Sequence, residues 1–463
     1  MKRTILVLAL TALLALGGSA FAEICTNDAV PAASMLIPYF AVDFSEDGCA
    51  GSGVTTLFSV NNASAAPTIA HVTLWTDWSV PVIDFDIYLS GYDVQTLNLR
   101  QIFCDGSLPE TGFGAAVGVA APGTNEGLFS LPNVPFPSCN NSTTPGDGPY
   151  YANPAITNIP GLLEVLQNWF TGQEALSSIA GSGQLGDTTA VGYITIDNLT
   201  DCSLEFPATP GYFTSGIVSN VNQLWGDFFI VDPANDFAQG FNAAHLEAGP
   251  ASVFADPLNP NVTFYGRYNG ATGVDLREPL GTTYATRYAL GGAFNGTNYF
   301  IWREGNADAN SVPVGSAPSW FPLDTANQSG AGPIIIFDED ENPIVPEVFT
   351  GPSNPIPPDN PEITIPYEVN LVNVRTGAAA AGVFDEIATG DFEFGWIYMN
   401  LQSSRTVYGT GFGQAWVGQR FVNDGRFSAG WEAISLDTSC IVSYTVNPAG
   451  PIAVNPDEPI LVQ

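Results

Sequence analysis

Lysine is almost absent from this chain: Lys2 is its one lysine among 463 residues. Lys2 and Arg3 precede an apolar run at residues 5–16 and a small-residue cleavage pattern at 20–22, which is typical of a signal peptide. We therefore expect residues 1–22 to be removed and the protein to be secreted to the extracellular medium or cell surface, or held in the periplasm. The mature chain then lacks the lysine that Schiff-base, amine-nucleophile and P-loop chemistry require.

Basic residues of any kind are scarce. Nine arginines remain after the signal segment, against 46 aspartates and glutamates in the chain. Nucleic acids and anionic membrane surfaces are bound through basic patches, so the composition excludes nucleic acid as a partner and disfavours anionic membrane surfaces. No apolar run after the signal reaches the roughly 18 residues that a membrane span needs, and we expect no membrane insertion.

Residues for nucleophilic or zinc-dependent hydrolysis are also missing. The chain has two histidines, His71 and His245, and neither a GxSxG nor an HExxH motif. His71 lies in the middle of an expected strand, where a structural role is the ordinary one. We therefore expect a protein that is not an enzyme and that needs no cofactor, with calcium as the one candidate ion.

Cysteine is sparse but even in number. Six cysteines in an exported chain predict three disulfides, and none has the CxxC spacing of a zinc or redox site. Of the 15 connectivities that six cysteines allow, we favour Cys25 with Cys49, Cys104 with Cys139, and Cys202 with Cys440.

Glycine and proline are abundant, at 48 and 36 residues, and separate short apolar runs. This pattern predicts an all-β protein with an immunoglobulin-like β-sandwich architecture, long Gly/Pro-rich loops and one short helix. The helix is expected from Leu162 to Phe170. The expected N-terminal strands cover residues 35–42, 54–61, 69–75, 82–89 and 94–99.

Composition also suggests a division of the chain. After the signal we expect an N-terminal β-sandwich domain at 23–105 and a Gly/Pro/Ser-rich loop or linker at 106–158. A helix followed by a larger β-rich domain is expected at 159–463, with a proline-rich strap at 343–366.

Two acidic clusters are candidates for calcium. Hard oxygen ligands gathered in a loop suit Ca²⁺, and the stronger cluster follows an apolar strand, although it lacks the EF-hand glycine. A solvated acidic turn is the simpler interpretation. The stronger cluster comprises Asp338, Glu339, Asp340 and Glu341, and the weaker one Asp43, Glu46 and Asp47.

A carboxylate pair and an aromatic row suggest sugar chemistry. Asp84 and Asp86 share one strand face, about 7 Å apart, which is in the range of a glycosidase pair but arises on any polar strand face. Phe392, Phe394, Trp396 and Tyr398 alternate along one strand, followed by Phe412 and Trp416. Trp396, Tyr398 and Trp416 are therefore candidate sugar-stacking residues, while an aromatic core is the interpretation that we favour.

Four of the nine arginines lie close together in sequence. They form either structural ion pairs that fix loops, which we favour, or a pocket for an anionic ligand or a neighbouring subunit. They are Arg267, Arg277, Arg287 and Arg303.

Two functional hypotheses follow. The first is a secreted, disulfide-stabilised β-sandwich protein with a structural, adhesive or envelope-associated surface role, acting through self-association or by contact with envelope components or polysaccharide. The alternative is an extracellular carbohydrate-binding protein or a carboxylate-based glycoside hydrolase. Burial of Trp396 and Trp416 distinguishes them.

Overall fold

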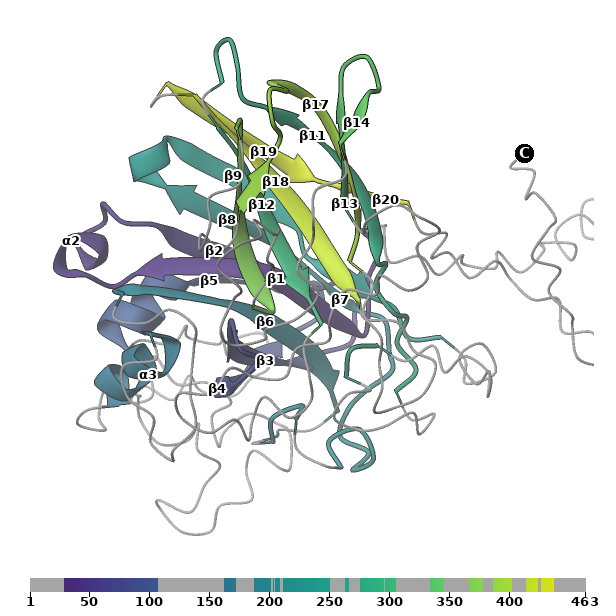
Figure 1. Cartoon of the computed structure of the whole chain (residues 1–463). Coiled ribbons are helices and arrows are strands. Elements are labelled where there is room, and N and C mark those ends of the chain that lie inside the picture. Colours follow the sequence, from purple (N-terminus) through teal and green to yellow (C-terminus); the bar gives the residue numbers. More distant parts are fainter. Residues whose placement is uncertain are drawn as a thin grey trace, which may run out of the picture. The chain divides into compact units, whose positions relative to one another are not determined.

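The computed structural model describes 15 stretches of the chain, and all of them fall in the contact unit Cys25–Ser439 (Figure 1). They are residues 29–106, 162–171, 187–200, 203, 205–208, 211–249, 263–265, 275–294, 296–304, 334–344, 365, 367–377, 386–401, 414–423 and 426–436.

The first sheet has the strand order β10-β1-β6-β3-β4, with all pairs antiparallel. Both of its faces are buried, since alternating residues such as Val72 and Thr73 are both inaccessible. Its strands are β1 (Ser34–Asp43), β3 (Thr68–Thr76), β4 (Pro81–Leu89), β6 (Thr189–Leu199) and β10 (Ala244–Leu246).

The second sheet has the order β5-β2-β8-β9, with the short strand β7 also paired to β2. One face contributes Phe228 and Phe241 to the core, whereas Phe229 on the other face is exposed. The strands are β2 (Thr55–Asn62), β5 (Val94–Asn98), β7 (Leu224–Trp225), β8 (Asp227–Asp232) and β9 (Phe237–Asn242).

The third sheet, ordered β16-β15-β12-β18-β19, contributes to two apolar cores. On β12, Phe300 and Trp302 join the core of the first two sheets, while Tyr299 and Ile301 join a second core. The strands are β12 (Gly296–Arg303), β15 (Val369–Arg375), β16 (Glu386–Ala388), β18 (Ala415–Asn423) and β19 (Phe427–Glu432).

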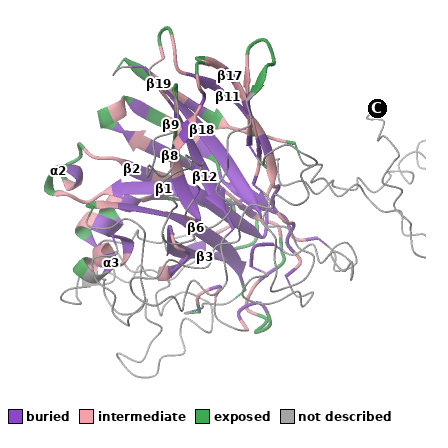
Figure 2. Cartoon of the chain, in the orientation of Figure 1, coloured by how far each residue is buried: buried purple, intermediate pink, exposed green. Residues whose placement is uncertain are grey.

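The fourth sheet, ordered β14-β13-β17-β11-β20, covers that second core with one face. Ile397 and Met399 are buried on this inner face. The exposed positions in Figure 2 concentrate at strand ends and turns. The strands are β11 (Thr283–Ala289), β13 (Ile334–Asp338), β14 (Pro343–Ile344), β17 (Phe394–Asn400) and β20 (Ile434–Ser435).

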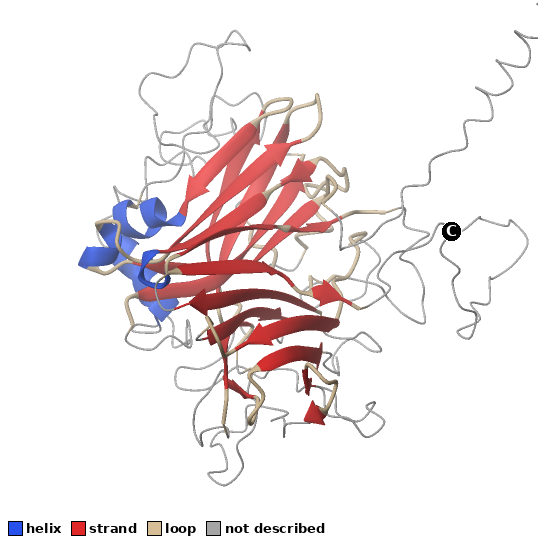
Figure 3. Ribbon diagram, turned by 90° about the horizontal axis from the view of Figure 1, so that it is seen from above, coloured by secondary structure: helices blue, strands red, loops and turns tan. Residues whose placement is uncertain are grey.

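The helical elements lie together beside the strands (Figure 3). They are α2 (Glu46–Cys49), the π-helical turn η1 (Gln101–Asp105) and α3 (Leu162–Thr171), and a 3-10 turn η6 (Pro233–Asn235) follows β8. Phe170 of α3 contacts Phe40 and Phe103 with ring centroids 5.7 and 5.0 Å apart. The predicted helix is confirmed, but α2 and the two turns were not expected.

One disulfide joins α2 to η1. Cys49 is bonded to Cys104, with the Cα atoms 5.6 Å apart. The predicted pairs Cys25–Cys49 and Cys104–Cys139 are therefore wrong, because β2 and β5 are adjacent antiparallel strands and bring the segments just outside them together. The predicted third pair, Cys202 with Cys440, lies outside the described residues, as do Cys25 and Cys139.

The all-β fold predicted from the sequence is confirmed, and so are the five expected N-terminal strands. The likeness to an immunoglobulin sandwich stays a prediction. Strands of 23–105 share sheets with later strands: β1 pairs with β6 and β10, and β2 pairs with β8. Residues 107–158 and most of the expected strap at 343–366 lie outside the described residues, and so does the signal segment.

Candidate functional site

The aromatic row on β17 lies on the outer face of the fourth sheet. Phe394, Trp396 and Tyr398 are half-buried, while the alternating Ile397 and Met399 are fully buried in the second core. The expectation of an aromatic core is therefore wrong for these three aromatic residues. It is confirmed for Trp416, which is buried in the first core, and Phe392 packs against the second core, while Phe412 lies outside the described residues. The aliphatic face of β17 is the one that packs inward, where its side chains share the second core with those of β12.

Trp396 is not an open stacking platform, however. It pairs across the sheet with Phe337 on β13, and the two rings stack with centroids 4.0 Å apart and an interplanar angle of 8°. One face of the indole is thereby covered by Phe337. Arg287 pairs with Trp396 from the opposite side, on β11. The row thus forms cross-strand side-chain contacts on the surface of the sheet. Sugar stacking on Trp396 and Tyr398 stays a prediction, and this arrangement does not favour it.

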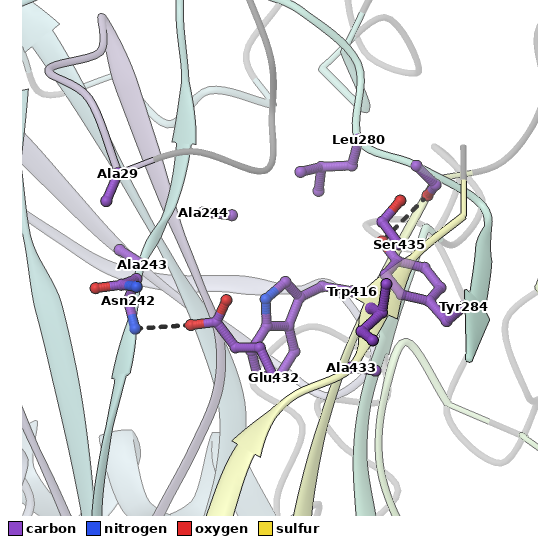
Figure 4. A pocket seen from close by; sticks show the side chains of 12 residues that line it. Ala29, Asn242, Ala243, Ala244, Leu280, Tyr284, Trp416, Glu432, Ala433 and Ser435 are labelled. Carbon is purple, nitrogen blue, oxygen red and sulfur yellow. Dashed lines mark hydrogen bonds between the residues drawn. The ribbon is translucent and has the colours of Figure 1, made fainter. Parts of the chain in front are cut away.

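Trp416 has a different environment. Its side chain is 7% exposed and packs against Phe228 and Phe241, with ring centroids 6.1 and 6.0 Å away. It also lines a hollow of about 240 Å³. Figure 4 shows Trp416 and Tyr284 on one side of this inner hollow, Ala29 and Ala244 on the other, and the Glu432 carboxylate between them.

A second, more open hollow of about 490 Å³ shares Asn242 and Glu432 with the first. Its exposed aromatic residues are Phe229 and Trp431, at 44% and 40%, and the buried Phe241 also lines it. Its polar side chains are those of Asp227, Gln239, Asn242 and Glu432. We call the two hollows together the seam cleft.

The seam cleft forms where edge strands of two sheets meet. β9 ends the second sheet and β19 ends the third, and side chains rather than a backbone ladder connect them. The backbone N–H of Asn242 donates to Glu432 Oε1 at 2.8 Å, and Ser428 Oγ donates to the Asn235 carbonyl at 2.6 Å. Because β9 and β19 are not paired by backbone hydrogen bonds, a concave space remains between the two strands.

Phe229 forms the floor of the outer hollow. It pairs with Gly240 on β9, and a Cβ on Gly240 would lie 2.6 Å from Cε1 of the Phe229 ring. The ring thus occupies the space over the glycine and leaves its other side exposed. An aromatic ring held in this way offers an apolar surface of fixed orientation.

The cleft is acidic. Asp227 and Glu432 are the only charged side chains among the described residues that line it. Burial raises the pKa of Glu432, and the hydrogen bond from the Asn242 backbone opposes that effect. Asp227 accepts a hydrogen bond from Ser59 Oγ at 2.6 Å. Each carboxylate that lines the cleft is thus held by a hydrogen bond and keeps further acceptor capacity.

The predicted carboxylate pair, Asp84 and Asp86, lies elsewhere and is buried around His71. His71 Nδ1 is 2.6 Å from Asp86 Oδ1, and its Nε2 is 3.8 Å from Asp84 Oδ2. Asp86 also accepts from the Ser203 backbone N–H at 3.0 Å. The side chains of His71 and Asp86 are inaccessible and that of Asp84 is 12% exposed, so a sugar has no access to the pair.

These charges control each other's titration. Burial alone would lower the pKa of His71, but the hydrogen bond to Asp86 and the nearby carboxylates raise it to about 9. Burial raises the pKa of Asp84 to about 6, against the attraction of His71. Burial lowers the pKa of His245 to about 4, against a hydrogen bond with the Ala243 backbone and the attraction of Asp227. His71 is therefore a structural cation and His245 a neutral imidazole at pH 7.

The arginine cluster is dispersed by the fold. Arg277 is fully buried and donates to the Ser219 carbonyl at 3.0 Å and to Asn220 Oδ1 at 3.2 Å, while its Nε donates to Ser34. Arg303 is buried, and burial lowers its pKa to about 10 despite the attraction of Glu368. Arg287 is exposed on β11. Arg267 lies outside the described residues, so the structure shows no common pocket for the other three.

The acidic candidates do not form a described metal site. Asp338 ends β13, and its Oδ1 accepts from the backbone N–H groups of Asp340 and Asn342 at 3.0 and 2.8 Å, which makes it the cap of a hairpin turn. Asp43 Oδ1 likewise accepts from the Ser45 backbone at 2.9 Å. Within the described stretches, no three acidic, histidine or cysteine side chains converge on a point, including those of Glu339, Glu341, Glu46 and Asp47.

Sequence reasoning found Trp416 but missed the rest of the seam cleft. Phe229, Trp431 and Glu432 lie on strands whose pattern is not unusual, and the cleft depends on which strands become sheet edges. The available signal was weak: Gly240 and Gly430 interrupt strands that each carry a bulky aromatic neighbour.

In the described part of the chain no helix is long and apolar enough to cross a membrane. Comparison with known proteins gives no relative: no family model, no curated protein and no solved structure matches this chain.

Proposed function

We propose that this protein is an extracellular, non-catalytic carbohydrate-binding protein with an adhesive role, and that the seam cleft is its binding site. The observation that carries the proposal is the exposed Phe229 ring, held over Gly240 and surrounded by polar side chains. The signal-like N-terminus and the Cys49–Cys104 disulfide support an extracellular location.

The chemistry of the cleft suits a sugar ring. A pyranose presents an apolar C–H face and a rim of hydroxyl groups, so it needs an aromatic surface beside hydrogen-bonding groups. Phe229 and Trp431 provide the aromatic surface, and Asp227, Gln239 and Asn242 provide acceptors and donors. Asn242 is exposed, and its side chain makes no hydrogen bond to another described residue, so it is available to a ligand.

Adhesion rather than hydrolysis is proposed because Asp84 and Asp86, the carboxylate pair considered for a glycosidase, are inaccessible to a sugar. Asp86 is committed to His71 and the Ser203 backbone, and its side chain is 0% exposed. A hydrolase would need a carboxylic acid and a carboxylate with room for water on either side of a glycosidic bond. Asp227 and Glu432 share the outer hollow, and an assay for released reducing ends therefore accompanies the binding test.

The experiment is a binding screen against soluble oligosaccharides by isothermal titration calorimetry. Phe229→Ala and Trp431→Ala are expected to weaken the strongest interaction at least tenfold. Trp396→Ala is the matched control, because it removes an aromatic of the outer surface that does not line the cleft. Equal binding by wild type and Phe229→Ala, or loss of binding in Trp396→Ala alone, would refute the assignment of the cleft. Release of reducing ends that is lost in Glu432→Gln would refute the non-catalytic role.

A further inference from the structure

The seam cleft combines negative charge with aromatic walls. Asp227 and Glu432 line it, no described basic side chain does, and the whole chain carries a formal charge of −35. An acidic sugar would be repelled both by these carboxylates and by the protein's field, whereas a cationic one would be attracted. The carboxylates of the cleft therefore favour a cationic ligand over an anionic one.

The inner hollow adds a place for a cationic group. The Glu432 carboxylate lies beside the Trp416 indole, and Tyr284 forms the adjoining wall (Figure 4). Carboxylate and aromatic faces together are the usual surroundings of a bound ammonium group, since both attract positive charge.

The remaining polar groups at this point are compatible with an ammonium donor. Glu432 Oε1 already accepts from the Asn242 backbone, which leaves lone pairs of the carboxylate for a ligand. Ser435 Oγ, which also lines the hollow, is buried and has no hydrogen-bond partner within the described structure. A hydroxyl oxygen can accept from an ammonium group, which has three protons to donate.

We propose that the seam cleft selects a saccharide bearing free primary amines, that is, a hexosamine polymer without N-acetyl groups. The sugar ring would lie on Phe229 in the outer hollow, with its ammonium group at Glu432 toward Trp416 and Ser435. This inference rests on the proposed carbohydrate-binding function and specifies its ligand. Burial raises the pKa of Glu432 in the free protein, and an adjacent ammonium group would favour the ionised carboxylate again.

N-acetylation provides the sharpest comparison. It removes the positive charge and adds a planar group while it leaves the sugar ring unchanged, so the apolar contact with Phe229 is preserved and the ion pair is lost. The probes are a glucosamine hexamer, the N-acetylglucosamine hexamer and a neutral glucose hexamer. We expect the amine form to bind at least tenfold more tightly than the other two at pH 6 and low salt, and to lose that advantage at a pH where the amine is neutral.

Two variants test the assigned contacts. Glu432→Gln keeps the shape of the side chain and is expected to abolish the preference for the amine form without abolishing binding of the neutral hexamers. Ser435→Ala is a second, smaller change, expected to reduce the same preference severalfold. Asp236→Asn, an exposed carboxylate at the end of η6, is the control for the general negative field.

The outcomes separate the two proposals. Equal affinity for the amine and N-acetyl forms in the wild type, with both dependent on Phe229, would overturn the amine assignment and leave carbohydrate binding intact. An equal loss of amine preference in Glu432→Gln and Asp236→Asn would overturn it too, because attraction would then be general. Absence of binding to all three probes overturns the amine assignment, while the wider oligosaccharide screen decides the proposed function.

Discussion

The Phe229 ring lies over Gly240 on the neighbouring strand, so closely that a Cβ on the glycine would approach Cε1 of the ring to 2.6 Å. The pair places an aromatic surface at the open edge between two sheets. It also makes a backbone position without a side chain necessary for the proposed binding site.

Gly240→Ala is therefore expected to displace the Phe229 ring and weaken saccharide binding by about two- to tenfold, the equivalent of the 0.5–1.5 kcal/mol that an aromatic contact contributes. Calorimetric titration of the best-bound oligosaccharide measures the effect. Gly296→Ala is the matched control, because a Cβ there meets nothing within 4 Å. An unchanged affinity in Gly240→Ala would show that the ring position does not matter for binding.

Glu432 is expected to reduce stability while it serves binding. Burial raises its pKa, so the folded state favours the protonated form and loses stability as the pH rises through that pKa. Glu432→Gln should therefore melt higher than the wild type at pH 7 and much like it at pH 3. Thermal unfolding at the two pH values tests this, with the exposed Glu393→Gln as control. A lower melting temperature of Glu432→Gln at pH 7 would contradict it.

His71 is expected to stabilise the fold as a cation. Its pKa is raised to about 9, so its contribution is complete below its ordinary pKa of 6.5 and is lost as the pH rises through about 9. The difference in unfolding free energy between wild type and His71→Asn should be largest near pH 6, at about 3 kcal/mol, and shrink toward pH 10. His245→Asn, at an imidazole whose pKa burial lowers to about 4, should show no such decline. Denaturant unfolding across this range that gave a constant difference for His71→Asn would exclude the charged pair.

Arg277 and Arg287 allow the stability contribution of a buried arginine to be compared with that of an exposed one. Arg277→Ala removes a buried guanidinium that lies 5.0 Å from the Phe213 ring centroid and 3.8 Å from Asp275, and is expected to cost about 3–5 kcal/mol. Arg287→Ala removes an exposed cation and should cost under about 1 kcal/mol. The two unfolding free energies, measured side by side, must differ in this order. A larger cost for Arg287→Ala would mean that the exposed arginine has an essential partner.

The Cys49–Cys104 bond should hold the helical elements beside β2. Its removal in the double variant Cys49→Ser/Cys104→Ser is expected to destabilise the protein by about 2–4 kcal/mol. Peptide mapping of the oxidised wild type checks the connectivity directly, since it must yield a peptide that links Cys49 to Cys104. Recovery of Cys49 linked to Cys25, or of Cys104 linked to Cys139, would contradict the fold in this region.

Local patterns predicted the elements well. Alternation placed β4, where Phe85 and Ile87 face the core, and a helical apolar pattern placed α3. Both the alternation and the helical pattern involve residues that are close in sequence, so they can be recognised from one sequence alone. The pattern could not say which face of β17 is inward, because Ile397 and Met399 on one face are as apolar as Trp396 and Tyr398 on the other.

Long-range arrangement was not predictable in the same way. The pairing of Cys49 with Cys104 follows from the adjacency of β2 and β5, and the seam cleft follows from β9 and β19 both being edge strands. Neither arrangement can be recognised from the residues within a single strand. Asp84 and Asp86 show that a local signal can also mislead. Their spacing suits a catalytic pair, but His71 on β3 lies opposite Asp86 and both carboxylates contact it.

A saccharide bound in the seam cleft must lie beside Trp431, so the fluorescence emission of this tryptophan reports binding there. Trp431 is 40% exposed in the outer hollow, so a bound sugar must change its surroundings. Titration with glucosamine hexamer is predicted to shift the tryptophan emission of the wild type and of Trp396→Phe in a saturable way, and to give a much smaller shift in Trp431→Phe, where Trp416 is the remaining tryptophan that lines the cleft. A saturable shift that persists undiminished in Trp431→Phe and disappears in Trp396→Phe would place the binding site on the outer face of the fourth sheet and not in the seam cleft.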